Sequence, residues 1–465
     1  HNQALETPVK KSSFIDSLIE KEKQESLRQR EQLKLQMLSQ ISTPPQKVEP
    51  RTEHKDSQYE FLRAFVFFFL IILLPIIVFY STYTCSEGKF LFDISSITRS
   101  QVASLFDINA TLVVLAWFFF HAFMAVLPIG PVMEGQPLKS GECLKYRCNG
   151  LFAFAVSFIL LGNAVYFEFP VTKVLDNYYK LITTSVIFSF VLSICLFVSS
   201  RFVDQKKLSP GGNTGNTIYD FFYGRELNPR IGMLDLKFFL ELRHGMIGWI
   251  VLDWIMVIKA YEETATFPPN LVLVAIFQTV YVVDSLVFEQ TFLPTLEIAH
   301  DGLGFMLTFG GLTWEPFFFS LQPLFLLKSS FTLPWYCLTA ITILNFAGFY
   351  VFRAASLEKM RFKSGSKHTS ASGVVSSTQT NGKLLESGFW GICRKPFYLG
   401  DLMMALSWSL ITGFGNIVTY SYFIYLLIFL INRDRRDSEN CRKKYGAIWD
   451  RYCQRVKYRI FPYIY

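Results

Sequence analysis

The chain has 465 residues, and 51% of them are hydrophobic while only 18% are charged. Soluble domains of this length rarely have such a composition, so these proportions exclude an ordinary soluble protein and indicate a membrane protein. The net charge of +8 arises largely in the C-terminal tail, and we interpret it as the basic excess of one membrane face and its anionic lipid headgroups rather than as a nucleic-acid surface.

Residues 1–59 are polar and form a separate N-terminal region. Ser13–Ile41 is rich in Glu, Lys, Gln and Leu, which favours a charged helix, and Thr43-Pro44-Pro45 ends it ahead of a flexible linker. A coiled coil is an alternative, although the leucines do not sustain a heptad repeat. Because the first residue is His1, we expect that a segment precedes it. No cleavable signal peptide is visible, since the first apolar run follows this polar region.

The rest of the chain contains about ten apolar stretches, most of them near the length of about 20 residues that a bilayer-spanning helix needs. They predict an all-α polytopic membrane protein with about ten transmembrane helices. We divide this part into an N-terminal transmembrane half, residues 60–260, and a C-terminal half, residues 261–465. The predicted spans are Phe61–Tyr83, Asn109–Ile129, Gly150–Phe167, Lys180–Ser200, Leu236–Lys259, Pro268–Phe288, Leu303–Leu327, Leu333–Phe352, Leu399–Phe414 and Ile417–Ile431.

Lys and Arg gather in the loops that follow even-numbered spans. These loops are Lys139–Arg147, Arg201–Lys237 and Arg353–Lys383, and the C-terminal tail is equally basic. By the positive-inside rule they share one membrane face, which we expect to be cytoplasmic or nucleoplasmic. The eight cysteines are dispersed, without a CxxC pair or metal-ligand spacing, so neither a disulfide framework nor a metal site is predicted.

Two long polar motifs carry a resemblance to a known family. The loop after the fourth span reads GNTIYDFFYGRELNPR, and the tail has the pattern R-x-x-R-D-x-x-x-C-x-x-K-Y-G from Arg433 to Gly446. Both resemble, in the same order, signatures of the sterol reductase family, which includes the Δ14- and Δ7-sterol reductases and the lamin B receptor. The resemblance covers residues 127–465, and the tail CQRVKYRIFPYIY is most similar to the lamin B receptor branch.

The resemblance implies reduction of a sterol ring double bond by NADPH. An isolated alkene is a poor hydride acceptor, so such a protein must protonate one carbon before hydride reaches the other. This chemistry needs an acid in an apolar cavity, a slot for the sterol, and cationic groups that hold the cofactor phosphates. The resemblance therefore implies a cofactor-pocket subdomain on the cytoplasmic side, within the C-terminal half.

Ionisable side chains inside or beside the predicted spans are candidates for the acid, because charges at membrane depth are costly and tend to line functional cavities. The candidate catalytic residues are Tyr281, His300 and Asp301, and Asp284 is a further candidate. Two structural alternatives remain open at this point. Tyr281 could be an interfacial anchor, and the His300–Asp301 pair could cap a helix.

The family pattern also implies a set of NADPH-binding residues. Basic side chains would meet phosphate, the tryptophan would stack on an aromatic ring, and carboxylates would take ribose or amide hydrogens. The alternative for each residue is a juxtamembrane charge or an interfacial aromatic ring. The positions are Lys359, Lys363, Leu385, Trp390, Arg394, Tyr398, Asp401, Arg433, Asp437 and Tyr445.

Several positions depart from the family pattern. Phe397 stands where an Asn is usual and has no amide to donate or accept hydrogen bonds, and Glu358 adds a negative charge beside the implied phosphate site. Each lost buried hydrogen bond costs about 1–3 kcal/mol, so several together could abolish NADPH use. The other departures are His244 for Pro, Gly311 for Asp, Lys363 for Arg and Asn432 for His.

We therefore favour a lamin-B-receptor-like protein of the inner nuclear membrane and endoplasmic reticulum, whose reductase activity is degenerate. Its expected partners are membrane lipid and sterol, together with lamin and chromatin through the N-terminal region. Two alternatives remain. One is an active NADPH-dependent Δ14-sterol reductase, and the other is a sterol-binding protein without turnover.

Overall fold

The computed structural model describes residues 53–88, 103–138, 141–329, 331–363 and 384–465. The chain divides into two compact units, His1–Phe61 and Leu62–Tyr465. The helix predicted at Ser13–Ile41 lies outside the described residues and stays a prediction. The second unit contains nearly all of the apolar stretches and both polar motifs.

The apolar stretches of the sequence form helices, as predicted. Among the described residues, six helices are long and apolar enough to cross a membrane, namely α2, α4, α7, α11, α15 and α18. The all-α membrane fold is thus confirmed, whereas the count of ten spans is not. The longer helices are α2 (Glu53–Glu87), α4 (Ile108–Val126), α5 (Gly150–Tyr166), α7 (Tyr178–Ser199), α10 (Met246–Thr264), α11 (Pro269–Val287), α15 (Trp335–Lys363), α17 (Pro396–Leu410) and α18 (Ser421–Tyr445).

Two of the predicted spans are interrupted by π-helices. The stretch predicted at Leu236–Lys259 begins as α9 (Leu236–Phe239), continues as the π-helix η4 (Leu240–Gly245) and ends in α10. The stretch predicted at Leu303–Leu327 consists of α13 (Phe305–Phe309), the π-helix η6 (Gly310–Phe318) and α14 (Leu321–Lys328). Pro316 lies inside η6, where its missing N–H is incompatible with a regular α-helix. Such π-helical segments occur frequently at functional sites.

The two π-helices pack closely because glycines lie at their contact. A Cβ atom on Gly311 of η6 would lie 2.7 Å from the carbonyl oxygen of Leu240, and one on Gly245 of η4 would overlap the carboxylate of Glu315. A side chain at Gly311 would require the backbone of η4 to shift, whereas one at Gly245 would displace the Glu315 side chain. The contact therefore brings Glu241 and Glu315 into one layer of the core.

Short elements connect the helices. In the described part of the chain the strands, which the sequence did not predict, form two antiparallel pairs, β1 (Val132–Pro137) with β2 (Cys143–Arg147) and β3 (Arg230–Ile231) with β4 (Leu234–Asp235). The remaining elements are α6 (Lys173–Asp176), η2 (Ser200–Phe202), η3 (Gln205–Lys207), α8 (Thr217–Tyr223), η5 (Glu289–Thr291), α12 (Leu296–Ala299), α16 (Phe389–Ile392), η7 (Ile417–Tyr420) and α19 (Ala447–Arg455).

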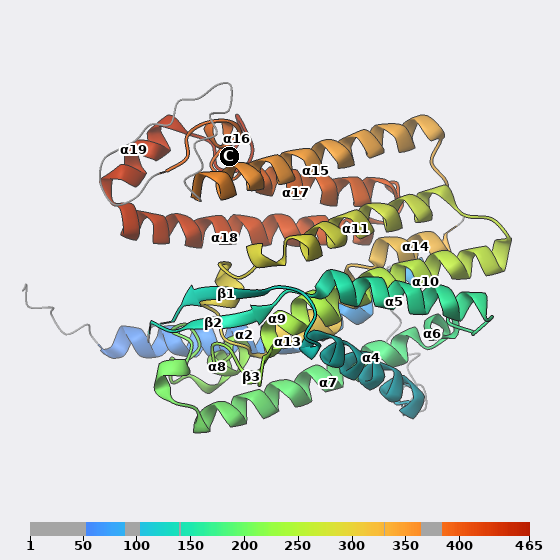
Figure 1. Ribbon diagram of the computed structural model, residues 1–465, viewed down its shortest axis with the longest axis horizontal. Coiled ribbons are helices and arrows are strands. Elements are labelled where there is room, and N and C mark those ends of the chain that lie inside the picture. The colour runs from blue at the N-terminus through green and yellow to red at the C-terminus, as the bar shows by residue number, and fades with distance from the viewer. Residues whose placement is uncertain (1–52, 89–102, 139–140, 330, 364–383) are drawn as a thin grey trace, which may run out of the picture. The chain divides into compact units, whose positions relative to one another are not determined.

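The β1–β2 pair, α8, α16 and α19 lie toward the same end of the long axis, on the left of Figure 1. The loops that the sequence predicted to share one membrane face lead into these elements. The arrangement therefore agrees with a common face for the basic loops.

A buried ion pair joins three segments near the start of α5. Arg243 Nη2 of η4 contacts Glu289 Oε2 of η5 at 2.8 Å, and both side chains are only 2% exposed. Arg243 Nη2 also donates to Asn149 Oδ1 at 3.1 Å, while the backbone N–H of Gly150 donates to Glu289. The opposite charge and the hydrogen bonds to Arg243 Nη2 and to the Glu289 carboxylate offset the cost of burial, although Arg243 Nη1 has no partner among the described residues.

We expect Glu289→Gln to destabilise the protein by about 3–5 kcal/mol, because it leaves the Arg243 charge buried without a counter-charge. Asp450→Asn is the matched control, since it breaks the Arg442–Asp450 pair, whose side chains are 71% and 48% exposed, and should cost no more than about 1 kcal/mol. Thermal unfolding in detergent measures both. Equal melting temperatures for the two variants would contradict the role assigned to the buried pair.

Candidate functional site

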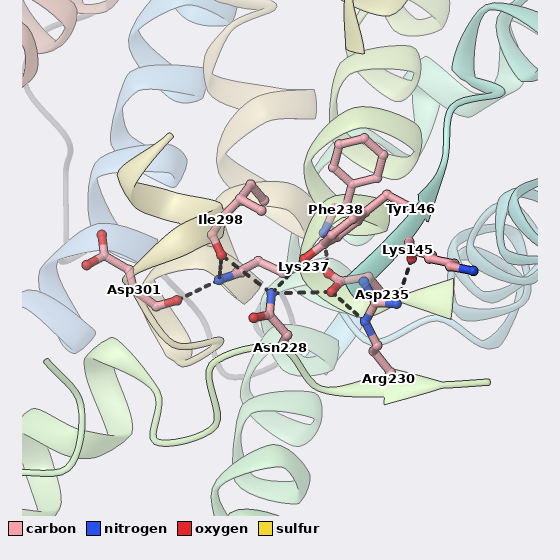
Figure 2. Close-up of polar contacts among 9 residues, drawn as sticks. All are labelled: Lys145, Tyr146, Asn228, Arg230, Asp235, Lys237, Phe238, Ile298 and Asp301. Atoms are coloured by element: carbon pink, nitrogen blue, oxygen red, sulfur yellow. Dashed lines mark hydrogen bonds and ion pairs between the residues drawn. The ribbon is translucent and has the colours of Figure 1, made fainter. Parts of the chain in front are cut away.

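The loop motif that ends in Leu227-Asn228-Pro229-Arg230 belongs to a polar network that Figure 2 shows. Arg230 Nε donates to Asp235 Oδ2 at 3.1 Å, and Arg230 Nη1 donates to the carbonyl oxygen of Lys145 at 2.8 Å. Asn228 Nδ2 donates to the hydroxyl of Tyr146 at 3.1 Å. These bonds tie the motif to β2 and to the start of α9, so its polar residues hold the fold together.

The same network fixes the backbone around the His300–Asp301 pair. Lys237 Nζ donates to the carbonyl oxygens of Ile298 and Asp301, at 2.9 and 2.6 Å, and its side chain is buried (Figure 2). The Asp301 carboxylate accepts a bond of 3.1 Å from Arg436, and the exposed His300 accepts one at its carbonyl oxygen from Ser209. These contacts favour a structural role for both predicted acids.

Tyr281 lies in a different environment, half-buried against the hydrophobic core. Its ring packs against Trp408 at 5.5 Å between centroids, and its hydroxyl interacts with the carboxyl group of Asp401. Asp401 is 8% exposed, and its Oδ1 has no hydrogen-bond partner among the described residues. The half-buried Tyr281 and the buried Asp401 thus form a pair of acidic groups, the arrangement that a proton donor to an apolar substrate requires.

Three glutamates that were not predicted as site residues surround this pair. Glu241 and Glu315 interact electrostatically with Tyr281, and Glu297 accepts a hydrogen bond of 2.9 Å from Arg433. We call these three residues together with Tyr281, Asp401 and Arg433 the carboxylate cluster. Glu241 and Glu315 lie within apolar stretches, so the criterion that selected Tyr281 would have found them.

Asp284, the fourth candidate acid, has a different partner. Its carboxylate forms an ion pair with Arg353 of α15, and the guanidinium of Arg353 lies 3.9 Å from the ring centroid of Phe288. The pair joins α11 to α15. We therefore assign Asp284 a structural contact.

Two of the predicted cofactor residues, Lys359 of α15 and Trp390 of α16, come together. Trp390 Nε1 donates to the carbonyl oxygen of Ala355 at 2.9 Å, and the ammonium of Lys359 lies 4.9 Å from the Trp390 ring. Phe397 joins them, with its ring 5.3 Å from the Lys359 ammonium and 5.6 Å from Trp390. An aromatic ring therefore packs where the resemblance predicts an amide.

Lys395 and Arg394 at the start of α17 are also engaged within the protein. Lys395 is 5% exposed, and its ammonium forms an ion pair with Asp437 of α18. Arg394 Nη2 donates to the carbonyl oxygen of Lys457 at 2.9 Å, and Nη1 contacts Cys453 Sγ at 3.1 Å. Arg394 thus faces the C-terminal segment around α19.

The remaining predicted cofactor residues are spread over the same end of the protein. Tyr398 is buried, Leu385 is half-buried, and Tyr445 packs against a small apolar cluster that includes Trp449. The side chain of Lys363 lies outside the described residues.

Burial lowers the pKa of Lys395 to about 7, and the positive charge of Lys359 contributes to the same shift. The negative charge of Asp434 opposes this shift by favouring the charged ammonium. Because the folded pKa lies below that of an unfolded lysine, the unfolded chain binds the proton more strongly between about pH 7 and pH 10. Stability should therefore rise with pH across this window, as the cost of the buried charge disappears.

We expect the melting temperature of the wild type, measured relative to Lys395→Met, to increase between about pH 7 and pH 9.5. The free energy of unfolding should rise with a limiting slope of about 1.4 kcal/mol per pH unit. The variant removes the titrating group and retains the apolar stem. Melting in detergent across the pH series gives the result. A pH-independent difference would mean that the ion pair with Asp437 keeps Lys395 protonated throughout.

Comparison with known proteins places the chain in a family. Residues 53–465 match the ergosterol biosynthesis ERG4/ERG24 family, so this polytopic membrane protein belongs to that sterol reductase family. The prediction made from the two motifs is thereby confirmed.

Several characterised relatives are similar over most of this chain. The chain is 41% identical to Delta(14)-sterol reductase LBR of Gallus gallus over 416 residues, which make up 89% of this chain and 65% of that protein. It is 38% identical to Delta(14)-sterol reductase TM7SF2 of Mus musculus, covering 85% of this chain and 95% of that protein. Identity to Delta(14)-sterol reductase erg24 of Schizosaccharomyces pombe is 37%, over 88% of this chain and 97% of that protein.

Proposed function

We propose that this protein is a sterol-binding membrane protein of the Δ14-sterol reductase type in which NADPH-dependent turnover is lost or strongly reduced. The observation that carries the proposal is the packing of Phe397 against Trp390 and beneath the Lys359 ammonium. The residues on this side of the protein fit NADPH poorly, while Tyr281 and Asp401 still form an acid pair.

The misfit follows from hydrogen bonding and charge. Phe397 has no atom that can donate to or accept from the polar groups of a nucleotide. Glu358 places a carboxylate beside Trp390, where it accepts a bond of 3.2 Å from the backbone N–H of Phe389. The Lys395 charge is already paired with Asp437. Each lost polar contact costs about 1–3 kcal/mol, or roughly tenfold to a hundredfold in affinity.

A retained membrane domain without turnover suits a role as an anchor. The similarity of the tail to the lamin B receptor branch supports a place in the inner nuclear membrane and endoplasmic reticulum. The polar region of residues 1–59 is then the segment that contacts lamin or chromatin, and the transmembrane helices hold it at the membrane.

A second candidate function is active reduction of a Δ14-sterol with NADPH as the cofactor. The observation in its favour is the carboxylate cluster, in which Tyr281 and Asp401 face each other next to Arg433. A buried acid pair of this kind is what protonation of a ring double bond needs. The names of the mouse and fission yeast relatives agree with this activity.

Purified protein assayed with NADPH and a Δ14-sterol separates the two candidates. We expect the wild type to form no reduced sterol above the background of Asp401→Asn, because the cofactor binds weakly. Phe397→Asn should gain detectable product, since the amide restores about 1–3 kcal/mol of polar contact. Mass spectrometry of the extracted sterols measures the product.

Phe414→Asn is the matched control, because the same substitution at a side chain that is 84% exposed should change nothing. Sterol binding, measured in parallel without NADPH, shows whether each variant is folded. Turnover by the wild type would overturn the proposed loss of activity and establish the second candidate.

A further inference from the structure

An apolar cavity of about 160 Å³ lies between α4, α7, α10 and the two π-helices. This cavity is separate from the carboxylate cluster. Among the described residues that line the cavity, none belongs to the cluster. A cavity of about 150 Å³ with an apolar lining is large enough to bind one six-membered ring. Side chains of its lining include Val113, Trp117, Ser185, His244, Leu252 and Phe317.

His244 is a polar residue in the lining of this cavity, and one of its ring nitrogens lacks a hydrogen-bond partner among the described residues. Its ring is 3% exposed, and Nδ1 lies 3.0 Å from the carbonyl oxygen of Gly311. A carbonyl oxygen only accepts hydrogen bonds, so in the neutral ring Nδ1 carries the proton and Nε2 is an acceptor. Nε2 is buried and has no partner among the described residues. An unsatisfied buried acceptor is costly, so a ligand that brings a donor is favoured.

The contact between His244 and Gly311 also connects two departures from the family pattern. The sequence has His in place of the usual Pro and Gly in place of the usual Asp at these positions. The Gly311 carbonyl fixes the orientation of the imidazole, and a side chain at Gly311 would crowd the Leu240 backbone at 2.7 Å. The two departures thus make one arrangement, which aligns a hydrogen-bond acceptor with the cavity lining.

The cavity opens toward the membrane-facing surface at Val113. This residue lines the cavity and is itself 45% exposed, and its neighbour Leu112 on α4 is 57% exposed. An apolar molecule can therefore enter from the bilayer without crossing the polar end of the protein. Trp117 and Phe317 contribute aromatic side chains to the lining, which suit a flat ring better than a flexible chain.

We propose that this cavity is a second sterol site, distinct from the carboxylate cluster, that takes the hydroxyl-bearing ring of a membrane sterol. The hydroxyl donates its hydrogen to His244 Nε2, the first ring fills the cavity, and the remaining rings project past Val113 into the lipid. Ring unsaturation is not read at this site, since no acid of the carboxylate cluster reaches it. The site goes beyond the proposed function and does not depend on NADPH.

Photoaffinity labelling of the full-length protein in nanodiscs tests the proposal. The probe is a saturated 3-hydroxysterol that carries a ring diazirine and an alkyne handle, because a saturated sterol cannot be reduced. We expect labelled peptides from α4 and α10. A saturated 3-hydroxysterol and a Δ14-unsaturated one should compete equally, whereas the parent hydrocarbon without the hydroxyl should compete at least about tenfold more weakly.

Two variants and a control make the test specific. His244→Leu removes the acceptor at similar volume and should lower labelling of α4 about tenfold. Val113→Trp should block the mouth of the cavity and so lower labelling, and because Val113 is exposed the change should not disturb the core. Leu112→Trp on the same helix is the control and should leave labelling unchanged. Thermal unfolding in detergent reports whether each variant still folds.

Unchanged labelling of α4 in Val113→Trp would overturn the proposal, even if His244→Leu failed to fold. Equal competition by the hydrocarbon would also overturn it, since the hydroxyl would then have no role. Stronger competition by farnesol, a linear isoprenoid alcohol, than by the sterols would reject the sterol ring as the occupant.

Discussion

Close packing of the π-helices η4 and η6 determines where the polar groups of this membrane protein lie. Gly311 and Gly245 allow the two segments to touch, since a side chain at either would meet Leu240 or Glu315. A π-helix places successive side chains at different angles from an α-helix. Neighbouring residues of η4 therefore contact different parts of the protein. Glu241 joins the carboxylate cluster, and His244 lines the apolar cavity.

Elsewhere in the transmembrane part, buried charged side chains form ion pairs. Arg243 is neutralised by Glu289 and Arg353 by Asp284, and each pair links elements that are distant in sequence. An isolated charge at this depth would be expensive, so the pairs stabilise a particular arrangement of helices. The carboxylate cluster differs, because several acids there share few cations and some oxygens stay unpaired among the described residues. A buried polar group without a partner lowers the stability of the fold. The same group is available for chemistry or for binding a ligand.

Much of the architecture could be predicted from apolar periodicity, because a bilayer requires long apolar helices. The π-helices could not, since the stretches around Glu241 and Glu315 have the same composition as regular spans. The candidate site was predicted in part through motifs, and Trp390 with Lys359 did come together. The contact of Phe397 with Trp390 shows what the substitution does, whereas the sequence could show only that an amide is missing.

The ion pair between Lys395 and Asp437 was beyond prediction for a different reason. It joins residues on separate helices, and nothing local to either residue indicates the other. Similarly, the role of Asp301 depends on Lys237 of α9, which donates to the backbone carbonyl oxygens of Ile298 and Asp301. Tertiary contacts of this kind decide whether a charged motif serves a cofactor or holds the fold.

The proposed loss of cofactor use is tested most directly by equilibrium binding of NADPH to the purified protein in nanodiscs, followed by NADPH fluorescence. Packing of Phe397 against Trp390 predicts no saturable binding of NADPH to the wild type below about 1 mM, the affinity that corresponds to about −4 kcal/mol. Saturable binding by the wild type in the micromolar range would contradict the proposed loss.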